Sequence, residues 1–200
     1  MIAARAFAIL LVSATLYAAP FKTTYWIAPC TDPASMCRAS DVELAEWAFN
    51  AWQKASDGAL EFTRVGDRNR AHISLYWATA EQGMYGETRP LLIDGEPGAE
   101  VFVRPSPSPA NGDGLLRDAI VYLTCLHESG HALGLAHTRA FDDIMYSFQF
   151  GGDIEEYFGR YRRKLTTRGD IAKNAGLSTA DEARLRKEIE RRRSVSGAVR

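Results

Sequence analysis

The chain is predicted to form a single α+β domain, and three observations lead to this fold class. Five short runs are rich in β-branched and aromatic residues, as strands are. They lie at 22–28, 60–65, 71–77, 85–92 and 99–104. Longer segments repeat apolar residues at helical spacing. They lie at about 42–56, 115–133 and 178–190. With 200 residues, of which 46% are hydrophobic, the chain can bury one core of its own.

Residues 1–18 are predicted to be a signal peptide and no part of the domain. Arg5 supplies a short positive region, and the apolar stretch 6–16 that follows is too short to span a bilayer comfortably. Small residues favour cleavage after Ala18. An uncleaved anchor is the alternative. In either case we expect the domain at 19–190 to be exported, to a secreted or periplasmic location.

Export makes the three cysteines informative. Cys30 and Cys37 lie seven residues apart in one loop, and in an oxidising compartment we expect them to form a disulfide. Cys125 is left over. It lies two residues before His127 and points away from the same helix face, so we expect a buried, unreactive thiol. A redox-labile or inhibitory thiol is the alternative.

The first helix is predicted to start at a capping box, Ser40-Asp41-Val42-Glu43. Ala45, Phe49 and Trp52 then recur at helical spacing, which predicts an amphipathic helix of about four turns with its aromatic side chains in the core. The loop at 105–114 precedes the second helix.

Three of the four histidines fall within residues 127–137 of that second helix and its exit. His127 and His131 are four residues apart, so on a helix they share one face and can bind one metal ion. Glu128 is rotated off that face but remains within reach of a water on the metal. This position suits a general base better than a ligand.

Gly134 and His137 complete the predicted metal site. Glycine ends a helix in the left-handed conformation without a steric cost, so the chain can turn back and bring His137 to the same ion. Three neutral imidazoles leave a fourth zinc position for water, which is the arrangement of catalytic sites. The sequence therefore predicts one catalytic Zn²⁺ on His127, His131 and His137, with Glu128 as general base.

These residues resemble a known family. The pattern H-E-x-x-H-x-x-G-x-x-H at 127–137, followed by Met145, is similar to the metzincin zinc endopeptidases, and most like small bacterial members of the matrixin branch. The resemblance implies a twisted, mixed five-stranded sheet with an antiparallel edge strand, a packing helix, the zinc-binding helix and a C-terminal helix. It implies that Met145 forms a hydrophobic floor under the histidines, and that an edge strand, which we place at 85–92, binds extended peptide.

The chain departs from the resemblance after Met145. Ser147 stands where some metzincins have a tyrosine ligand, and the matrixin proline after Tyr146 is absent. We expect 147–177 to be an aromatic-rich helical insert that covers one wall of the cleft. The last helix is expected to start at a cap over 178–181, and the tail at 191–200 to be basic and frayed.

The formal net charge is −1, but the charge is unevenly distributed. Residues 160–200 hold 13 Lys and Arg against 5 Asp and Glu, whereas the remainder holds 11 against 20. We interpret the basic residues at 160–200 as a solvent-exposed helix face that lies near the more acidic remainder of the domain. Binding of an acidic partner by this basic region is the alternative.

We therefore expect an exported zinc endopeptidase that acts on extended peptide or protein, as a monomer, without nucleic acid and without a membrane after signal cleavage. A zinc exopeptidase, a hydrolase of non-protein amides such as peptidoglycan stems, and a binding module with a residual motif are the alternatives. His72 alone cannot build a second histidine site. A calcium site formed by side-chain oxygens is also left open, although no spacing pattern supports it. The candidate ligands are Asp94, Glu96, Glu100 and Asp113.

Overall fold

Five strands form one mixed sheet in the computed structural model, which describes residues 19–79, 85–105 and 112–198. In chain order they are β1 (Phe21–Ile27), β2 (Leu60–Arg64), β3 (Ile73–Trp77), β4 (Gly86–Ile93) and β5 (Glu96–Val103). The sheet order is β2-β1-β3-β5-β4, and only the β4–β5 pair is antiparallel. The expected mixed sheet is confirmed, and the edge strand lies where 85–92 was predicted. The predicted signal peptide lies outside the described residues.

A two-residue turn at Asp94-Gly95 joins β4 to β5. Both residues have positive φ, 53° and 82°, which is the backbone of a type I′ hairpin turn and suits Asp-Gly. Strand β5 therefore begins at Glu96, earlier than the predicted start at residue 99. The turn fixes the register in which Gly86 pairs with Val103.

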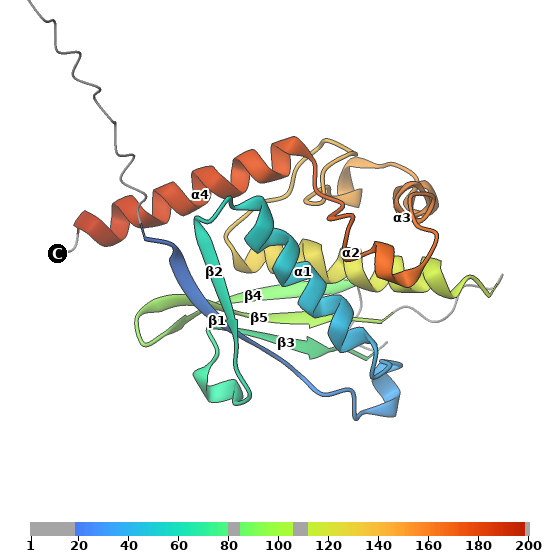
Figure 1. Cartoon of the computed structure of the whole chain (residues 1–200), viewed down its shortest axis with the longest axis horizontal. Helices are drawn as coiled ribbons and strands as arrows, with labels where there is room; N and C mark the ends of the chain where they lie inside the picture. The colour runs from blue at the N-terminus through green and yellow to red at the C-terminus, as the bar shows by residue number, and fades with distance from the viewer. Residues whose placement is uncertain (1–18, 80–84, 106–111, 199–200) are drawn as a thin grey trace, which may run out of the picture.

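Four α-helices complete the fold. They are α1 (Asp41–Ala55), α2 (Gly114–Ala132), α3 (Ile154–Arg162) and α4 (Thr179–Ala198). Helices α1 and α2 lie on the same side of the sheet, and α4 runs back toward the start of β1 (Figure 1). There Arg193 donates to the Ala19 carbonyl at 2.8 Å. None of the helices in the described part of the chain has the length and apolar content needed to cross a bilayer.

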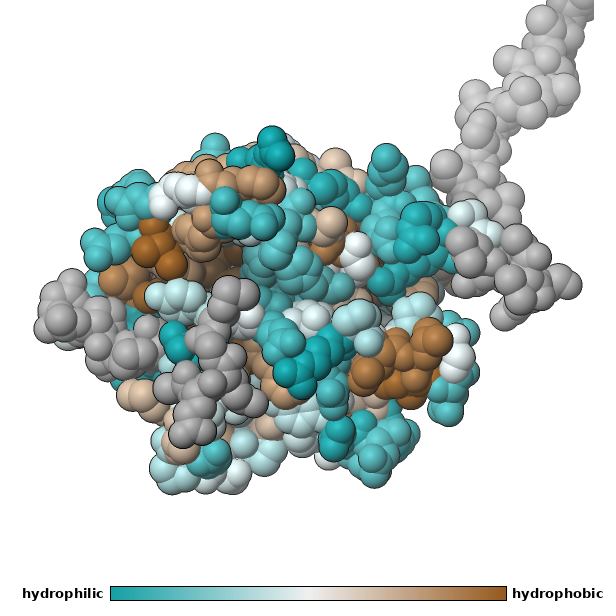
Figure 2. All heavy atoms as spheres, turned by 180° about the vertical axis from the view of Figure 1, so that it is seen from behind, coloured by the Kyte–Doolittle hydropathy of each residue, from teal (hydrophilic) through white to brown (hydrophobic). Residues whose placement is uncertain are grey.

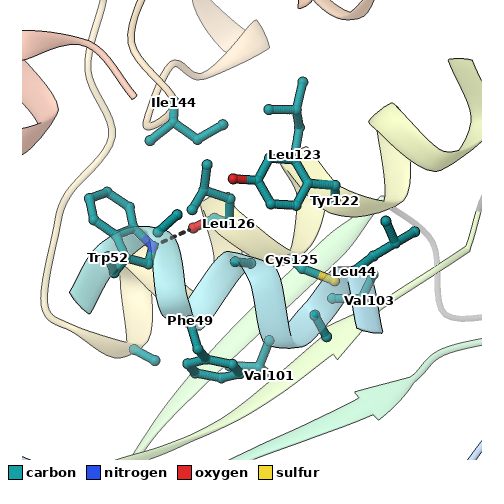
Figure 3. Packing of buried hydrophobic residues seen from close by; sticks show 14 of the residues in the cluster. Leu44, Phe49, Trp52, Val101, Val103, Tyr122, Leu123, Cys125, Leu126 and Ile144 are labelled. Atoms are coloured by element: carbon teal, nitrogen blue, oxygen red, sulfur yellow. Dashed lines mark hydrogen bonds between the residues drawn. The ribbon is translucent and has the colours of Figure 1, made fainter. Parts of the chain in front are cut away.

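Helix α2 packs against both α1 and the sheet in the hydrophobic core (Figure 3). Phe49 and Trp52 of α1 and Val101 of β5 are completely buried together with Leu126 of α2. The Trp52 indole donates to the Leu126 carbonyl at 2.9 Å, which satisfies its buried N–H. Each such side chain contributes about 1.5–3 kcal/mol by burial. Helix α2 is therefore a rigid platform for the side chains on its other face.

The predicted capping box at the start of α1 is wrong. Ser40 has helical φ and ψ, and its side chain makes no capping hydrogen bond. Asp41 instead accepts from the Arg38 N–H at 2.8 Å and forms a buried ion pair with Arg117. The carboxylate of Asp41 thus bonds to the chain just before α1 and also to a side chain of α2. The sequence around α1 alone could not indicate the contact with α2.

The start of α4 agrees with its prediction, and its end does not. The Asp181 N–H donates to the Ser178 hydroxyl at 3.0 Å, and the Ser178 N–H donates to the Asp181 carboxylate at 2.9 Å. The helix then continues through Ala198, where a frayed tail was expected from residue 191. Arg191 and Arg192 both pair with Glu188, so basic residues of this helix are balanced locally.

The cysteine predictions are confirmed. Cys30 and Cys37 form a disulfide, with Cα atoms 5.7 Å apart. Cys125 is free and buried on α2, and burial raises the pKa of its thiol well above the ordinary value.

Candidate metal centre

Helix α2 and the turn that ends it bring three histidines together. His127 and His131 lie one turn apart on α2, with ring centroids 4.8 Å apart. Gly134 then takes φ +90°, and the Leu135 N–H returns to the Gly130 carbonyl at 3.0 Å. This left-handed ending reverses the chain and brings the ring of His137 to within 4.6 Å of that of His131.

The three Nε2 atoms form a nearly equilateral triangle. The separations are 3.1 Å for His127–His131, 3.1 Å for His131–His137 and 3.2 Å for His127–His137. Tetrahedral nitrogen ligands at about 2.0–2.1 Å from zinc would lie about 3.3–3.4 Å from one another. The triangle matches this spacing within a few tenths of an ångström. In the described ranges, no other group of three His, Cys, Asp or Glu ligand atoms comes this close together.

Backbone carbonyls orient two of the rings. Nδ1 of His127 donates to the Ile144 carbonyl at 2.6 Å, and Nδ1 of His131 donates to the Leu135 carbonyl at 2.8 Å. A carbonyl only accepts, so the proton sits on Nδ1 and the Nε2 lone pairs point into the triangle. Burial lowers the pKa of His127 to about 4 and also lowers the pKa of His131 and His137. All three rings are therefore neutral at pH 7, as metal ligands must be.

Met145 lies beneath this part of α2. It is completely buried, and a Cβ placed on Gly130 would lie only 2.5 Å from its sulfur. The Thr138 N–H donates to the Met145 carbonyl at 2.8 Å, which fastens the segment after His137 to the turn that carries the methionine. Gly130 is thus the place where the helix and the methionine make close contact.

Two residues that sequence reasoning missed bond to the backbone of Ile144, one at its carbonyl and one at its N–H. Tyr157 of α3 donates its hydroxyl to this carbonyl at 3.2 Å, and the Ile144 N–H donates to the Asp181 carboxylate at 2.8 Å. Helix α3 lies inside the predicted insert at 147–177. The insert therefore contacts the groups that orient His127. No local pattern could have indicated these contacts, because they join residues 13 and 37 positions apart.

Glu128 is turned away from the histidines toward the edge strand. Its side chain is almost fully buried, and Thr88 of β4 donates to Oε2 at 2.7 Å. The pKa of Glu128 is raised to about 7: burial is the main cause, the Thr88 hydrogen bond opposes it, and the nearby Glu87 carboxylate adds a smaller increase. Its carboxylate is absent from the cluster of ligand atoms. This placement fits the predicted general base better than a metal ligand.

Strand β4 leaves one edge of the sheet open next to Glu128. No strand in the described part of the chain pairs with its outer side. Toward the hairpin turn, Leu91 and Leu92 are 41% and 76% exposed, and an apolar patch is visible there at the right of Figure 2. At the other end, the Tyr85 ring lies 6.0 Å from Phe158 of α3, so strand and insert meet beside the site.

The acidic residues for which a calcium site was left open, Asp94, Glu96, Glu100 and Asp113, form no cluster of three possible ligands among the described residues. Glu100 pairs with Arg68 at 3.0 Å, and Asp113 caps α2 and pairs with Arg162. Nδ1 of His72 lies 2.9 Å from the Thr24 hydroxyl, and His72 is not part of the histidine cluster. A separate cavity of about 550 Å³ lies between α3 and residues 173–178. None of the three clustered histidines lines it.

No protein-family model matches the chain, and no curated protein is significantly similar to it. The site must therefore be interpreted from its own residues.

Proposed function

We propose that this chain is a zinc-dependent endopeptidase of the metzincin type, most like the matrixin branch. One observation carries the proposal: three neutral imidazoles converge within 3.2 Å, and Glu128 follows the first of them on the same helix. Structural zinc sites use four protein ligands, whereas three ligands are typical of catalysis. The mixed sheet with its open antiparallel edge strand is compatible with the metzincin fold.

The chemistry divides between the ion and the chain. A zinc ion on His127, His131 and His137 would lower the pKa of a water to about 7 and polarise the substrate carbonyl. Glu128 accepts the proton of the attacking water and then delivers it to the leaving amine. Its Oε1 has no hydrogen-bond partner among the described residues and is the atom available for this transfer.

The open edge of β4 supports an extended peptide as substrate. A peptide added to this edge would gain main-chain hydrogen bonds along its length, on both sides of the scissile bond. Binding of the substrate on both sides of the scissile bond favours an endopeptidase over an exopeptidase. The Cys30–Cys37 disulfide and the predicted signal peptide support export to an oxidising compartment, where we propose that the chain acts as a monomer.

A peptide blocked at both termini tests the proposal. Residues 19–200 are incubated with zinc and an internally quenched, doubly blocked peptide library, with and without a chelator. We expect cleavage that the chelator abolishes and added zinc restores. Cleavage of free-ended peptides only would indicate the exopeptidase alternative. Cleavage of peptidoglycan stems only would indicate the non-protein amide hydrolase.

A further inference from the structure

The carboxylate of Glu128 contacts strand β4 rather than the histidine side of the site. The Thr88 hydroxyl lies 2.7 Å from Oε2 and 2.9 Å from the backbone carbonyl of Glu128. A hydroxyl has one proton and can donate to one of these oxygens at a time. The carbonyl already belongs to the hydrogen-bond ladder of α2, and Oε2 is the nearer of the two acceptors. The proton of Thr88 is therefore directed to Oε2.

Gly86 makes this contact sterically possible. A Cβ at residue 86 would lie 2.5 Å from Cγ, 2.6 Å from Oε1 and 2.8 Å from Cδ of Glu128. Gly86 and Thr88 are two residues apart in one strand, so both face α2. One supplies a hydrogen bond, and the other supplies the space that the carboxylate occupies.

We propose that Thr88 is a positioning residue for Glu128, holding Oε2 and leaving Oε1 unbonded for proton transfer, and that the absence of a side chain at Gly86 leaves room for the carboxylate in this orientation. The inference rests on the function proposed above. Its consequence is that the strand expected to bind the substrate also orients the base. The same strand then positions both the peptide and the carboxylate that accepts the proton. A contact from a loop would hold the carboxylate less precisely.

Paired substitutions at residue 88 test the positioning role. In zinc-loaded chain, Thr88→Val removes the hydroxyl with little change in shape, and we expect kcat to fall about 10- to 100-fold, the range seen when an outer partner of a site is lost. KM and the zinc content should stay unchanged. Thr88→Ser should retain kcat within about twofold because it keeps the donor. Thr63→Val, on exposed β2, is the matched control and should behave as wild type.

A second measurement uses the metal-free chain and needs no activity. Thr88→Val is made in wild type and in Glu128→Ala, and urea midpoints are compared. We expect the valine to lower the midpoint in wild type and to change it much less when the carboxylate is absent. If Thr88→Val folds poorly, the urea midpoints of Thr88→Ser and Thr88→Ala are compared instead in the same two backgrounds, because serine keeps the hydroxyl and alanine lacks it.

Two results would overturn the inference. One is an unchanged kcat in Thr88→Val with Glu128 still essential. The other is an equal midpoint shift in both backgrounds. Full activity in Glu128→Ala would instead overturn the proposed function itself, so the two failures can be told apart.

Discussion

The two sides of the candidate site are built in different ways. The histidine side is held by several backbone groups: the carbonyls of Ile144 and Leu135 orient two rings, and Asp181 holds Ile144 in turn. The Glu128 side depends on one hydroxyl and one glycine of an edge strand. In the proposed enzyme, metal binding and proton transfer would thus be supported by separate parts of the fold. Substitutions should therefore affect them separately.

Loss of a histidine ligand should have the largest effect. In His131→Ala we expect zinc content to fall well below one ion per chain and peptide cleavage to fall to background, because two imidazoles cannot hold a catalytic zinc. Metal analysis and peptide cleavage check this. His72→Ala is the matched control, since His72 lies outside the cluster, and it should keep both properties. A fully zinc-loaded His131→Ala would contradict the ligand assignment.

Gly86→Ala should damage the base side alone. The new Cβ would displace the Glu128 carboxylate, and a displacement of about 1 Å in a catalytic group can cost about 10²-fold in rate. Zinc content should remain at one per chain. Gly66→Ala is the control, because Gly66 is exposed and a Cβ there meets no atom within 4 Å. Parallel loss of zinc and activity in Gly86→Ala would show that the two sides are not separable.

The buried carboxyl of Glu128 should make the metal-free chain sensitive to pH. Burial raises its pKa to about 7 in the folded chain, from an ordinary value of 4.5. The folded state therefore binds the proton more tightly, and stability from this group is present below pH 4.5 and is lost as pH rises through 7. Glu128→Gln has no such loss.

Urea unfolding of both metal-free chains measures this effect. We expect Glu128→Gln to be more stable than wild type by about 3 kcal/mol at pH 8 and nearly equal to it at pH 4.5. Comparing the two chains removes the contribution of the histidines, which both chains share. An equal difference at both pH values would show that the Glu128 environment is not apolar.

Tyr157→Phe should have the smallest effect. The hydroxyl donates to the Asp143 and Ile144 carbonyls at 3.1 and 3.2 Å, and its loss leaves the Ile144 carbonyl still bonded to His127. We expect about 0.5–1.5 kcal/mol of lost stability and little loss of zinc affinity. Tyr76→Phe is the control, since its hydroxyl lies at a long 3.5 Å from the Glu100 carboxylate and is remote from the histidine cluster in sequence. A large loss of zinc from Tyr157→Phe would mean that α3 is part of the metal support.

The sequence predicts what depends on regular spacing. The strands and the convergence of His127 with His131 follow from periods of two and four residues, whereas the edge position of residues 85–92 came from the family resemblance. Strand β5 starts at Glu96, before the predicted start at residue 99, because Asp94 and Gly95 alone make the turn.

Contacts between distant segments could not be predicted. Thr88 reaches Glu128 across 40 residues, and nothing near residue 88 distinguishes it from any other strand threonine. A glycine within a strand is a weak signal of close backbone approach, so Gly86 could have been singled out. The ion pair of Asp41 could not be predicted either, because its partner Arg117 is distant in sequence.

Zinc content and cleavage measured together in Glu128→Ala test the central claim most directly. We predict one zinc per chain, as in wild type, and cleavage of a doubly blocked peptide reduced by about 10²–10⁴-fold, because the histidines remain and the proton acceptor is gone. Wild-type cleavage by this variant would contradict the assignment of Glu128 as the general base. Loss of zinc together with activity would contradict the separation of the two sides of the site.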